Sequence, residues 1–318
     1  MEVIQVPDRP VSQSFYAVAG RLLIVESVDP QVRKLIVDLF SGWQLAQVSF
    51  PDRSPDIRIE FCGDSPPQIP PNLDQFEIAE GGRCYTDRGD LYLALGDVLV
   101  HLENGSPVKV QLWFDEIPAA GDPLPARATS FAVCAALRRF GMFELHSAGM
   151  IEPRSEKGVL IIGPSGSGKS TLALQLAKAG WPYLSDDEVL LSMVDGEVEA
   201  RGFRSFFAVR GAAALKTCFE PDGVRRSKAS PGVLLFTSLS GQQKTRLDRL
   251  TQAESMTRLI RACPWATYDT SIAGANLELL SKLARQTSAF DLSAGRDLLE
   301  PGYAASLFSE SLCLGGGK

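Results

Sequence analysis

The sequence has 318 residues, a length that favours two domains over one. Apolar residues make up 45% and charged residues 22%, a composition that is typical of folded chains and excludes disordered, collagen-like and low-complexity proteins. Because 32 Lys and Arg stand against 38 Asp and Glu, the net charge is -6, and we expect no nucleic-acid partner.

The sequence predicts a cytoplasmic protein without a membrane partner. Residues 1–10 lack a basic start followed by an apolar run, so we expect no secretory signal. No segment approaches the roughly 18 uninterrupted apolar residues that a membrane-spanning helix needs. The cysteines are scattered without a Cys-x-x-Cys pair and the only histidines are His101 and His146, so we expect reduced thiols and no structural zinc site.

Residues 1–120 predict a small α+β accessory or recognition domain. Asp29 and Pro30 form an N-cap followed by proline at the first helical position, which predicts a helix over residues 30–43. Short apolar runs separated by turn residues follow, and the pair Gly96-Asp97 predicts a hairpin. We expect strands at residues 57–61, 91–95, 98–102 and 108–113.

A segment rich in Pro, Gly and Ala, residues 118–125, is the predicted linker to a second domain at 126–318. Thr251 and Glu254 form a capping box that predicts a helix start, and Gly180 is typical of a residue just beyond a helix end. The expected helices are 129–140, 169–179, 251–261 and 272–286, and the expected strands are 143–146, 158–162, 190–194, 197–200, 232–236 and 246–250. This mixture predicts an α/β fold with a mixed central sheet and antiparallel hairpins.

The strongest motif is a complete phosphate-binding loop pattern (P-loop or Walker A), G-x-x-x-x-G-K-S, between an apolar strand and a helix. Its glycines let backbone N–H groups turn toward a phosphate, and the following helix adds its positive end. In such a loop Lys169 reaches the β- and γ-phosphates and Ser170 is a ligand of Mg²⁺. We therefore predict a nucleoside triphosphate ligand. The predicted binding residues are Gly163, Pro164, Ser165, Gly166, Ser167, Gly168, Lys169, Ser170 and Thr171.

A pair of carboxylates, Asp186 and Asp187, follows a short apolar strand one helix after the loop. We expect this pair at the carboxyl edge of the sheet, where ligands bind in open α/β folds. Beside Mg²⁺, one carboxylate can hold the metal while the other, if its neighbour raises its pKa, accepts a proton. An exposed acidic turn is the alternative interpretation.

The loop at 163–170, the helix ending before Gly180 and the strand into Asp186-Asp187 together resemble the catalytic domain of HPr kinase/phosphorylase. Residues 199–202 (EARG), 247–250 (LDRL) and 294–297 (AGRD) are similar to further segments of that family, and His146 precedes the loop by about the family's distance. The resemblance covers about residues 140–300. Residues 202–204 (GFR) depart from the family's G-L-G, so the resemblance implies the broader group of HPr kinase-like proteins.

The resemblance implies a role for each matching residue. Asp187 is the expected proton acceptor toward a substrate hydroxyl, and Asp186 and Glu199 are expected near the metal. His146 is expected to contact the phosphates or the transferred group. Arg249 is expected to stabilise negative charge on the phosphoryl oxygens, the main task in phosphoryl transfer. From the residues alone, His146 is equally well a packing histidine, and Glu199 and Arg249 are equally well exposed strand residues.

We therefore predict a kinase that uses ATP and Mg²⁺ to transfer a phosphoryl group to a hydroxyl, with serine of a protein, a peptide or a small molecule as the expected acceptor. ATP is favoured over GTP by the resemblance, and the guanine-reading pattern N-K-x-D is absent. The resemblance also allows a homo-oligomer. The alternative is a nucleotide-dependent switch or ATPase that binds a protein partner without kinase activity.

Overall fold

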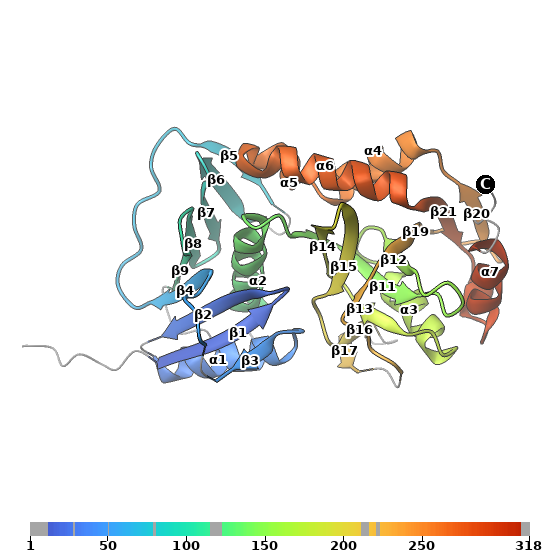
Figure 1. The fold of residues 1–318 in the computed structure, drawn as a ribbon, viewed down its shortest axis with the longest axis horizontal. Helices are drawn as coiled ribbons and strands as arrows, with labels where there is room; N and C mark the ends of the chain where they lie inside the picture. Colours follow the sequence, from blue (N-terminus) through green and yellow to red (C-terminus); the bar gives the residue numbers. More distant parts are fainter. Residues whose placement is uncertain are drawn as a thin grey trace, which may run out of the picture. The chain divides into compact units, whose positions relative to one another are not determined.

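The computed structural model describes residues 12–27, 29–49, 51–78, 81–114, 123–210, 216–220 and 223–312 (Figure 1). The chain divides into two compact units, the first made of residues 1–41 and 45–140 and the second of residues 42–44 and 141–318. Within the described ranges, no helix combines the length and the apolar character that crossing a membrane requires.

The first unit is built on a nine-stranded sheet of mixed direction. The strands predicted at 57–61, 91–95, 98–102 and 108–113 are confirmed as β4, β7, β8 and β9, and Gly96 forms the predicted turn with a φ of 54°. In spatial order the strands are β3 (Ala46–Val48), β1 (Ser12–Val18), β2 (Arg21–Ser27), β4 (Ile57–Cys62), β9 (Val108–Phe114), β8 (Val98–Glu103), β7 (Asp90–Leu95), β6 (Arg83–Asp87) and β5 (Asp74–Glu77).

Two helices complete the first unit. Helix α1 (Pro30–Ser41) begins as predicted, because the Asp29 carboxylate accepts a hydrogen bond of 2.7 Å from the Gln31 backbone N–H. Helix α2 (Pro123–Arg138) begins earlier than predicted, since proline is tolerated in the first turn of a helix. It packs on β7, β8 and β9, so the boundary between the compact units falls after Phe140 rather than at 120–126. Residues 118–122 of the predicted linker lie outside the described part.

The second unit contains a six-stranded sheet in which β12, β19 and β21 are parallel neighbours. In spatial order its strands are β13 (Tyr183–Ser185), β11 (Ser147–Ile151), β12 (Gly158–Ile162), β19 (Pro231–Leu239), β21 (Ser288–Ala294) and β20 (Arg246–Arg249). A four-stranded sheet follows the order β10 (Phe143–Leu145), β14 (Val189–Val194), β15 (Glu197–Gly202) and β18 (Lys228–Ala229), and β16 (Phe207–Arg210) pairs with β17 (Lys216–Phe219). The predicted mixed α/β fold is thereby confirmed.

The central strand β12 divides its side chains between two apolar clusters, because successive side chains point to opposite faces. Val159 and Ile161 pack with residues of α3 and α7, whereas Leu160 and Ile162 pack with residues of α4 and α6. Figure 1 shows α4 and α6 along one side of this unit and α3 beside the other. The helices are α3 (Lys169–Lys178), α4 (Gln252–Ala262), α5 (Trp265–Tyr268), α6 (Thr270–Gln286) and α7 (Tyr303–Leu312), and η2 (Arg296–Leu299) is a short 3-10 helix.

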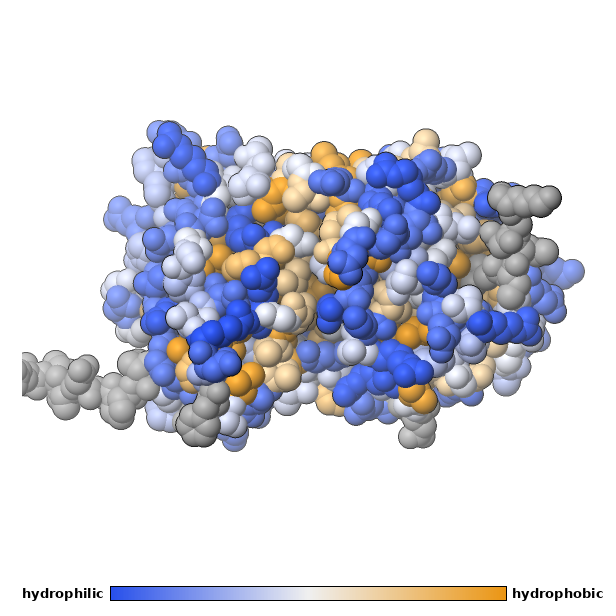
Figure 2. All heavy atoms as spheres, viewed as in Figure 1, coloured by the Kyte–Doolittle hydropathy of each residue, from blue (hydrophilic) through white to orange (hydrophobic). Residues whose placement is uncertain are grey.

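The outer surface of each unit is mostly polar on the face drawn in Figure 2, where hydrophilic residues surround smaller apolar patches. Two exposed leucines are exceptions that bear on the site: Leu239 is 65% exposed and Leu299 is 57% exposed. Leu239 is the last residue of β19 and Leu299 ends η2, which follows β21, so both lie near the carboxyl ends of parallel strands, the edge at which open α/β sheets bind ligands.

Candidate functional site

The loop between β12 and α3 has the backbone that its glycines predict. Gly166 and Gly168 have φ values of 82° and 93°, a region that side chains rarely tolerate. At Gly163 an added Cβ would lie 2.5 Å from the Ser167 hydroxyl and 2.6 Å from the Thr237 carbonyl oxygen. The loop is therefore packed tightly against the end of β19, and its shape depends on glycine at these positions.

The side chain of Lys169 is 5% exposed and is held by the loop and by a histidine. Its Nζ donates hydrogen bonds of 2.8 Å to the Gly163 carbonyl and 3.2 Å to the Pro164 carbonyl. The same nitrogen lies 2.9 Å from His146 Nε2. Since an ammonium group only donates, this contact makes Nε2 the acceptor and assigns the ring proton to Nδ1.

The other ring nitrogen of His146 faces Asp187. Nδ1 lies 3.0 Å from the Asp187 carbonyl oxygen and 3.3 Å from its carboxylate Oδ1. His146 thus connects the loop lysine to the second acid of the pair. Asp187 has a φ of 71°, a left-handed conformation that aspartate and asparagine adopt more readily than most residues. Strained backbone of this kind gathers at functional sites, and the carboxylate is 48% exposed.

The strand before the two acids is braced by residues 202–204, where the sequence departs from the resembled family. Ser185 Oγ accepts hydrogen bonds of 3.2 Å and 2.8 Å from the backbone N–H groups of Phe203 and Arg204. After the pair, Glu188 accepts two contacts of 2.7 Å from the Arg204 guanidinium. Burial raises the pKa of Glu188 despite Arg204, and the negative charge of Asp187 adds to the rise. These contacts fix the backbone on both sides of the acids.

Of the three predicted metal ligands, Ser170 and Asp186 lie near the loop and the end of β13. Ser170 is the second residue of α3, and its hydroxyl makes no hydrogen bond in the described part of the chain. Asp186 is 1% exposed and directly follows β13, whose direction matches that of β12. Among the described residues no three His, Cys, Asp or Glu side chains cluster as a metal centre. Magnesium commonly takes one or two protein oxygens and completes its shell with phosphates and water, and Ser170 and Asp186 offer oxygen ligands of the kind that it prefers.

The third predicted ligand, Glu199, does not fit. It lies on β15 of the four-stranded sheet, where its carboxylate is 2.5 Å from Arg201 and 3.0 Å from Lys228. Glu199 is therefore already neutralised by two cations. Nor does it line the pocket that adjoins the loop. The geometry supports a structural ion pair in place of the expected metal role.

Arg249, which the resemblance implies for stabilising charge on the phosphoryl oxygens, lies apart from the loop pocket. Arg249 is exposed on the edge strand β20 and pairs with Phe290 of β21, so the two share a face of the sheet. Phe290 packs against the cluster that includes α3 and α7 residues. Arg249 is absent from the described residues that line the pocket beside the loop.

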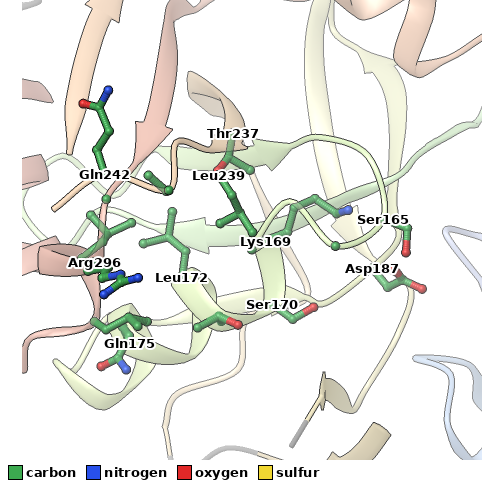
Figure 3. Close-up of a pocket in the computed structure, with 18 of the residues that line it drawn as sticks. Ser165, Lys169, Ser170, Leu172, Gln175, Asp187, Thr237, Leu239, Gln242 and Arg296 are labelled. Atoms are coloured by element: carbon green, nitrogen blue, oxygen red, sulfur yellow. The ribbon is translucent and has the colours of Figure 1, made fainter. Parts of the chain in front are cut away.

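A pocket of about 530 Å³, called the loop pocket below, lies beside the loop and α3. Ser165 and Asp187 lie at one end, with the Lys169 side chain directed toward that end (Figure 3). The other end is formed by Gln242 and Arg296, beyond Leu172 and Leu239 (Figure 3). The volume suits a ligand of nucleotide size. Polar side chains therefore lie at both ends of the loop pocket, and the apolar side chains of Leu172 and Leu239 lie between them.

The far wall of the loop pocket was missed by sequence reasoning. Thr245 donates its backbone N–H and its hydroxyl to Asp297, at 2.9 Å and 2.6 Å. The Arg296 N–H donates to the Gln242 carbonyl at 3.0 Å. These bonds tie the turn after β19 to the turn after β21. The sequence singles out 294–297 by its resemblance, but no local pattern indicates that this segment meets the turn after β19.

The fold and the loop define this unit as a mixed α/β module with a phosphate-loop sequence between a central strand and a helix. No protein-family model matches the chain. The chain is 29% identical over 197 residues to the HPr kinase/phosphorylase of Neisseria meningitidis, covering 58% of this chain and 60% of that protein. It is 33% identical over 135 residues to that of Chromobacterium violaceum, covering 41% and 42%. The resemblance to HPr kinase-like proteins is thus confirmed.

The first of these matches spans 60% of the relative's length. Among solved structures, the Hpr(Ser) kinase/phosphatase of Coxiella burnetii matches 54% of this chain and 99% of its own, with a TM-score of 0.32 and 12% identity.

Proposed function

We propose that the second unit is a kinase domain that transfers the γ-phosphoryl group of ATP to a hydroxyl, in the presence of Mg²⁺. The observation that carries the proposal is the hydrogen-bonded series Lys169, His146, Asp187 at the loop end of a nucleotide-sized pocket. The similarity to proteins named HPr kinase/phosphorylase supports the same reaction class. Serine is the acceptor that this similarity favours.

The residues at the loop end match the tasks of phosphoryl transfer, which are positioning and neutralisation of charge. The backbone N–H groups of the loop and the start of α3 bind phosphate oxygens. Lys169 exchanges its contacts with the Gly163 and Pro164 carbonyls for phosphate oxygens. Ser170 and Asp186 would hold Mg²⁺, which would supply positive charge beside the phosphates.

Asp187 accepts the proton of the acceptor hydroxyl. The hydroxyl oxygen bonds to the γ-phosphorus, the bond from that phosphorus to the β–γ bridging oxygen breaks, and ADP leaves with the electron pair. His146 Nδ1 donates to Asp187 and orients its carboxylate. Because Lys169 lies on the other side of the same ring, the base and the loop cation are held in a fixed relation.

The test is the substitution Asp187→Asn, measured with γ-labelled ATP and candidate acceptors. Asparagine also adopts positive φ, so the backbone is preserved and nucleotide affinity is expected to stay within about twofold. Transfer is expected to fall by about 10²–10⁴, the usual contribution of a general base. The matched control is Asp195→Asn, at another aspartate with positive φ, 49°, in the β14–β15 turn. Equal transfer rates in both variants would refute the assignment of Asp187.

The same assay separates the kinase from the alternative switch or ATPase. Label on an added hydroxyl compound supports the kinase, whereas label in free phosphate alone, with every acceptor tried, supports the switch. Calorimetry of ATP with millimolar Mg²⁺ tests the shared premise. A folded protein that binds no nucleoside triphosphate contradicts both functions.

A further inference from the structure

A second pocket, of about 480 Å³, lies on the opposite side of the loop from the loop pocket. We call it the arginine pocket, because Arg258 and Arg261 of α4 form part of its wall. Gly163 and Pro164 line it at the start of the loop, and Phe236 and Ser238 line it at the end of β19. Its position at the carboxyl ends of β12 and β19 is one where open α/β sheets bind ligands.

The two pockets meet at His146 and Thr237, which line both of them. His146 contacts Lys169 and Asp187, the residues assigned to the phosphate end of the loop pocket. A molecule in the arginine pocket therefore reaches His146, whose ring contacts the proposed base Asp187. An acceptor bound there lies one residue away from the proposed base, on the far side of the start of the loop from α3.

The arginine and aspartate side chains that line the arginine pocket carry a net positive charge. Arg258 forms an ion pair with Asp291 and lies 5.5 Å from the centre of the Phe236 ring, so its guanidinium is fixed and neutralised. Arg261 lies three residues further along the same helix face, is exposed, and makes no hydrogen bond or ion pair in the described part of the chain. A planar guanidinium with free N–H groups binds carboxylate and phosphate in particular.

We propose that the arginine pocket is the acceptor site and that it selects hydroxyl acceptors bearing a carboxylate or phosphate group, which Arg261 binds with the remaining N–H groups of Arg258. The proposal rests on the phosphoryl-transfer function proposed above. The pocket volume admits a small molecule or one residue with its attached anionic group. The apolar floor of Ile162 and Phe236, 2% and 6% exposed, lowers the local dielectric and strengthens the attraction.

The test measures binding of inorganic phosphate and, separately, of acetate by calorimetry, with the protein saturated with Mg²⁺ and β,γ-imido-ATP so that the loop is filled. Arg261→Gln is expected to lower the affinity for the preferred anion at least about tenfold, because it removes one charged hydrogen bond. Arg261→Lys is expected to restore part of the affinity. The phosphate and acetate arms show which anionic group the acceptor carries.

The matched control is Arg285→Gln, because Arg285 is also exposed and also lies in the last turn of its helix, α6. Both substitutions remove a favourable interaction with a helix end, so a difference between them reports on the pocket. No anion binding by the wild type, or equal affinity in Arg261→Gln and Arg285→Gln, overturns the proposal while the kinase function stands. Failure of the imido-ATP to bind at all instead contradicts the kinase function.

Discussion

Lys169 has its ammonium protons engaged by two loop carbonyls and His146 before any phosphate is present. A buried ammonium without such partners is costly, so these contacts stabilise the empty loop. A phosphate must compete with them, and the affinity for nucleotide reflects the difference between the two sets of hydrogen bonds. His146 keeps both of its partners, Lys169 and Asp187, while Lys169 exchanges the two loop carbonyls, and these contacts hold the ring in place.

Gly163→Ala tests how closely the loop is packed. The added Cβ would meet the Ser167 hydroxyl and the Thr237 carbonyl at distances that real Cβ atoms do not show, and the carbonyl belongs to backbone that cannot easily move. We expect a loss of stability of about 1–3 kcal/mol and a loss of nucleotide binding of tenfold or more, as is usual for overpacking. Urea unfolding and nucleotide titration measure the two effects.

The control for this substitution is Gly274→Ala in α6, where an added Cβ meets nothing within 4 Å. Alanine is expected there to raise the free energy of unfolding by about 0.5–1 kcal/mol, since glycine is unfavourable inside a helix. If both variants were equally stable and bound nucleotide alike, the tight packing of Gly163 against β19 would be disproved.

Elements with strong local signals were predictable from the sequence. The capping box at Thr251 and Glu254 is present in full and begins α4, and Gly180, with a φ of 88°, follows α3 as expected. The buried strand β12 was readable because both of its faces are apolar. In contrast, β1 and β2 were missed, since their pairing is set by tertiary contacts and their ends carry weaker turn signals.

Sequence analysis could predict only those parts of the candidate site that are formed by residues close together in the sequence. The loop and the acid pair are contiguous segments, and their proximity follows from strand direction. The placement of Glu199 and Arg249 required knowledge of the sheet order, because each lies on a strand away from the loop. The arginine pocket combines the ends of two strands with the last turns of α4, and no pattern in the sequence joins these segments.

The hairpin of β11 and β12, which leads into the loop, is stabilised by Glu152. This side chain is 3% exposed, and its carboxylate accepts bonds of 2.7 Å and 3.1 Å from the Ser155 and Arg154 N–H groups. Burial alone would raise the pKa of Glu152, but the bonds from Ser155 and Arg154 outweigh burial and lower it below 4.5. The folded chain therefore holds the ionised form more firmly than the unfolded chain does.

Because folding lowers the pKa of Glu152, its stabilisation is complete above the unfolded-state pKa of about 4.5. The stabilisation is lost as the pH falls through the lower folded-state pKa. Glu152→Gln is expected to cost about 1–2 kcal/mol at neutral pH and to flatten the fall in stability below about pH 5. Urea unfolding across this pH range measures both. Glu156→Gln in the same turn, where the side chain is exposed, should leave the profile unchanged. If the stability of wild type and of Glu152→Gln fell in parallel with decreasing pH, the stabilising role of ionised Glu152 would be contradicted.

At the scale of the whole chain, the loop, the acid pair and both pockets all lie within the second unit. The second unit also has its own apolar clusters, and the first unit has a separate nine-stranded sheet. Each unit can therefore unfold as its own cooperative transition. A ligand that binds one of them stabilises only that one.

We accordingly expect two transitions in differential scanning calorimetry, of which only one rises when Mg²⁺ and ATP analogue are added. At a ligand concentration of about 100 times Kd the stabilisation is about 2.7 kcal/mol, which raises the midpoint of a unit of this size by about 5–10 °C. In the variant Lys169→Met, which lacks the loop cation, we expect the midpoint of neither transition to rise when Mg²⁺ and ATP analogue are added. A single transition, or two that rise together by the same amount, would show that the units unfold as one and would contradict this prediction.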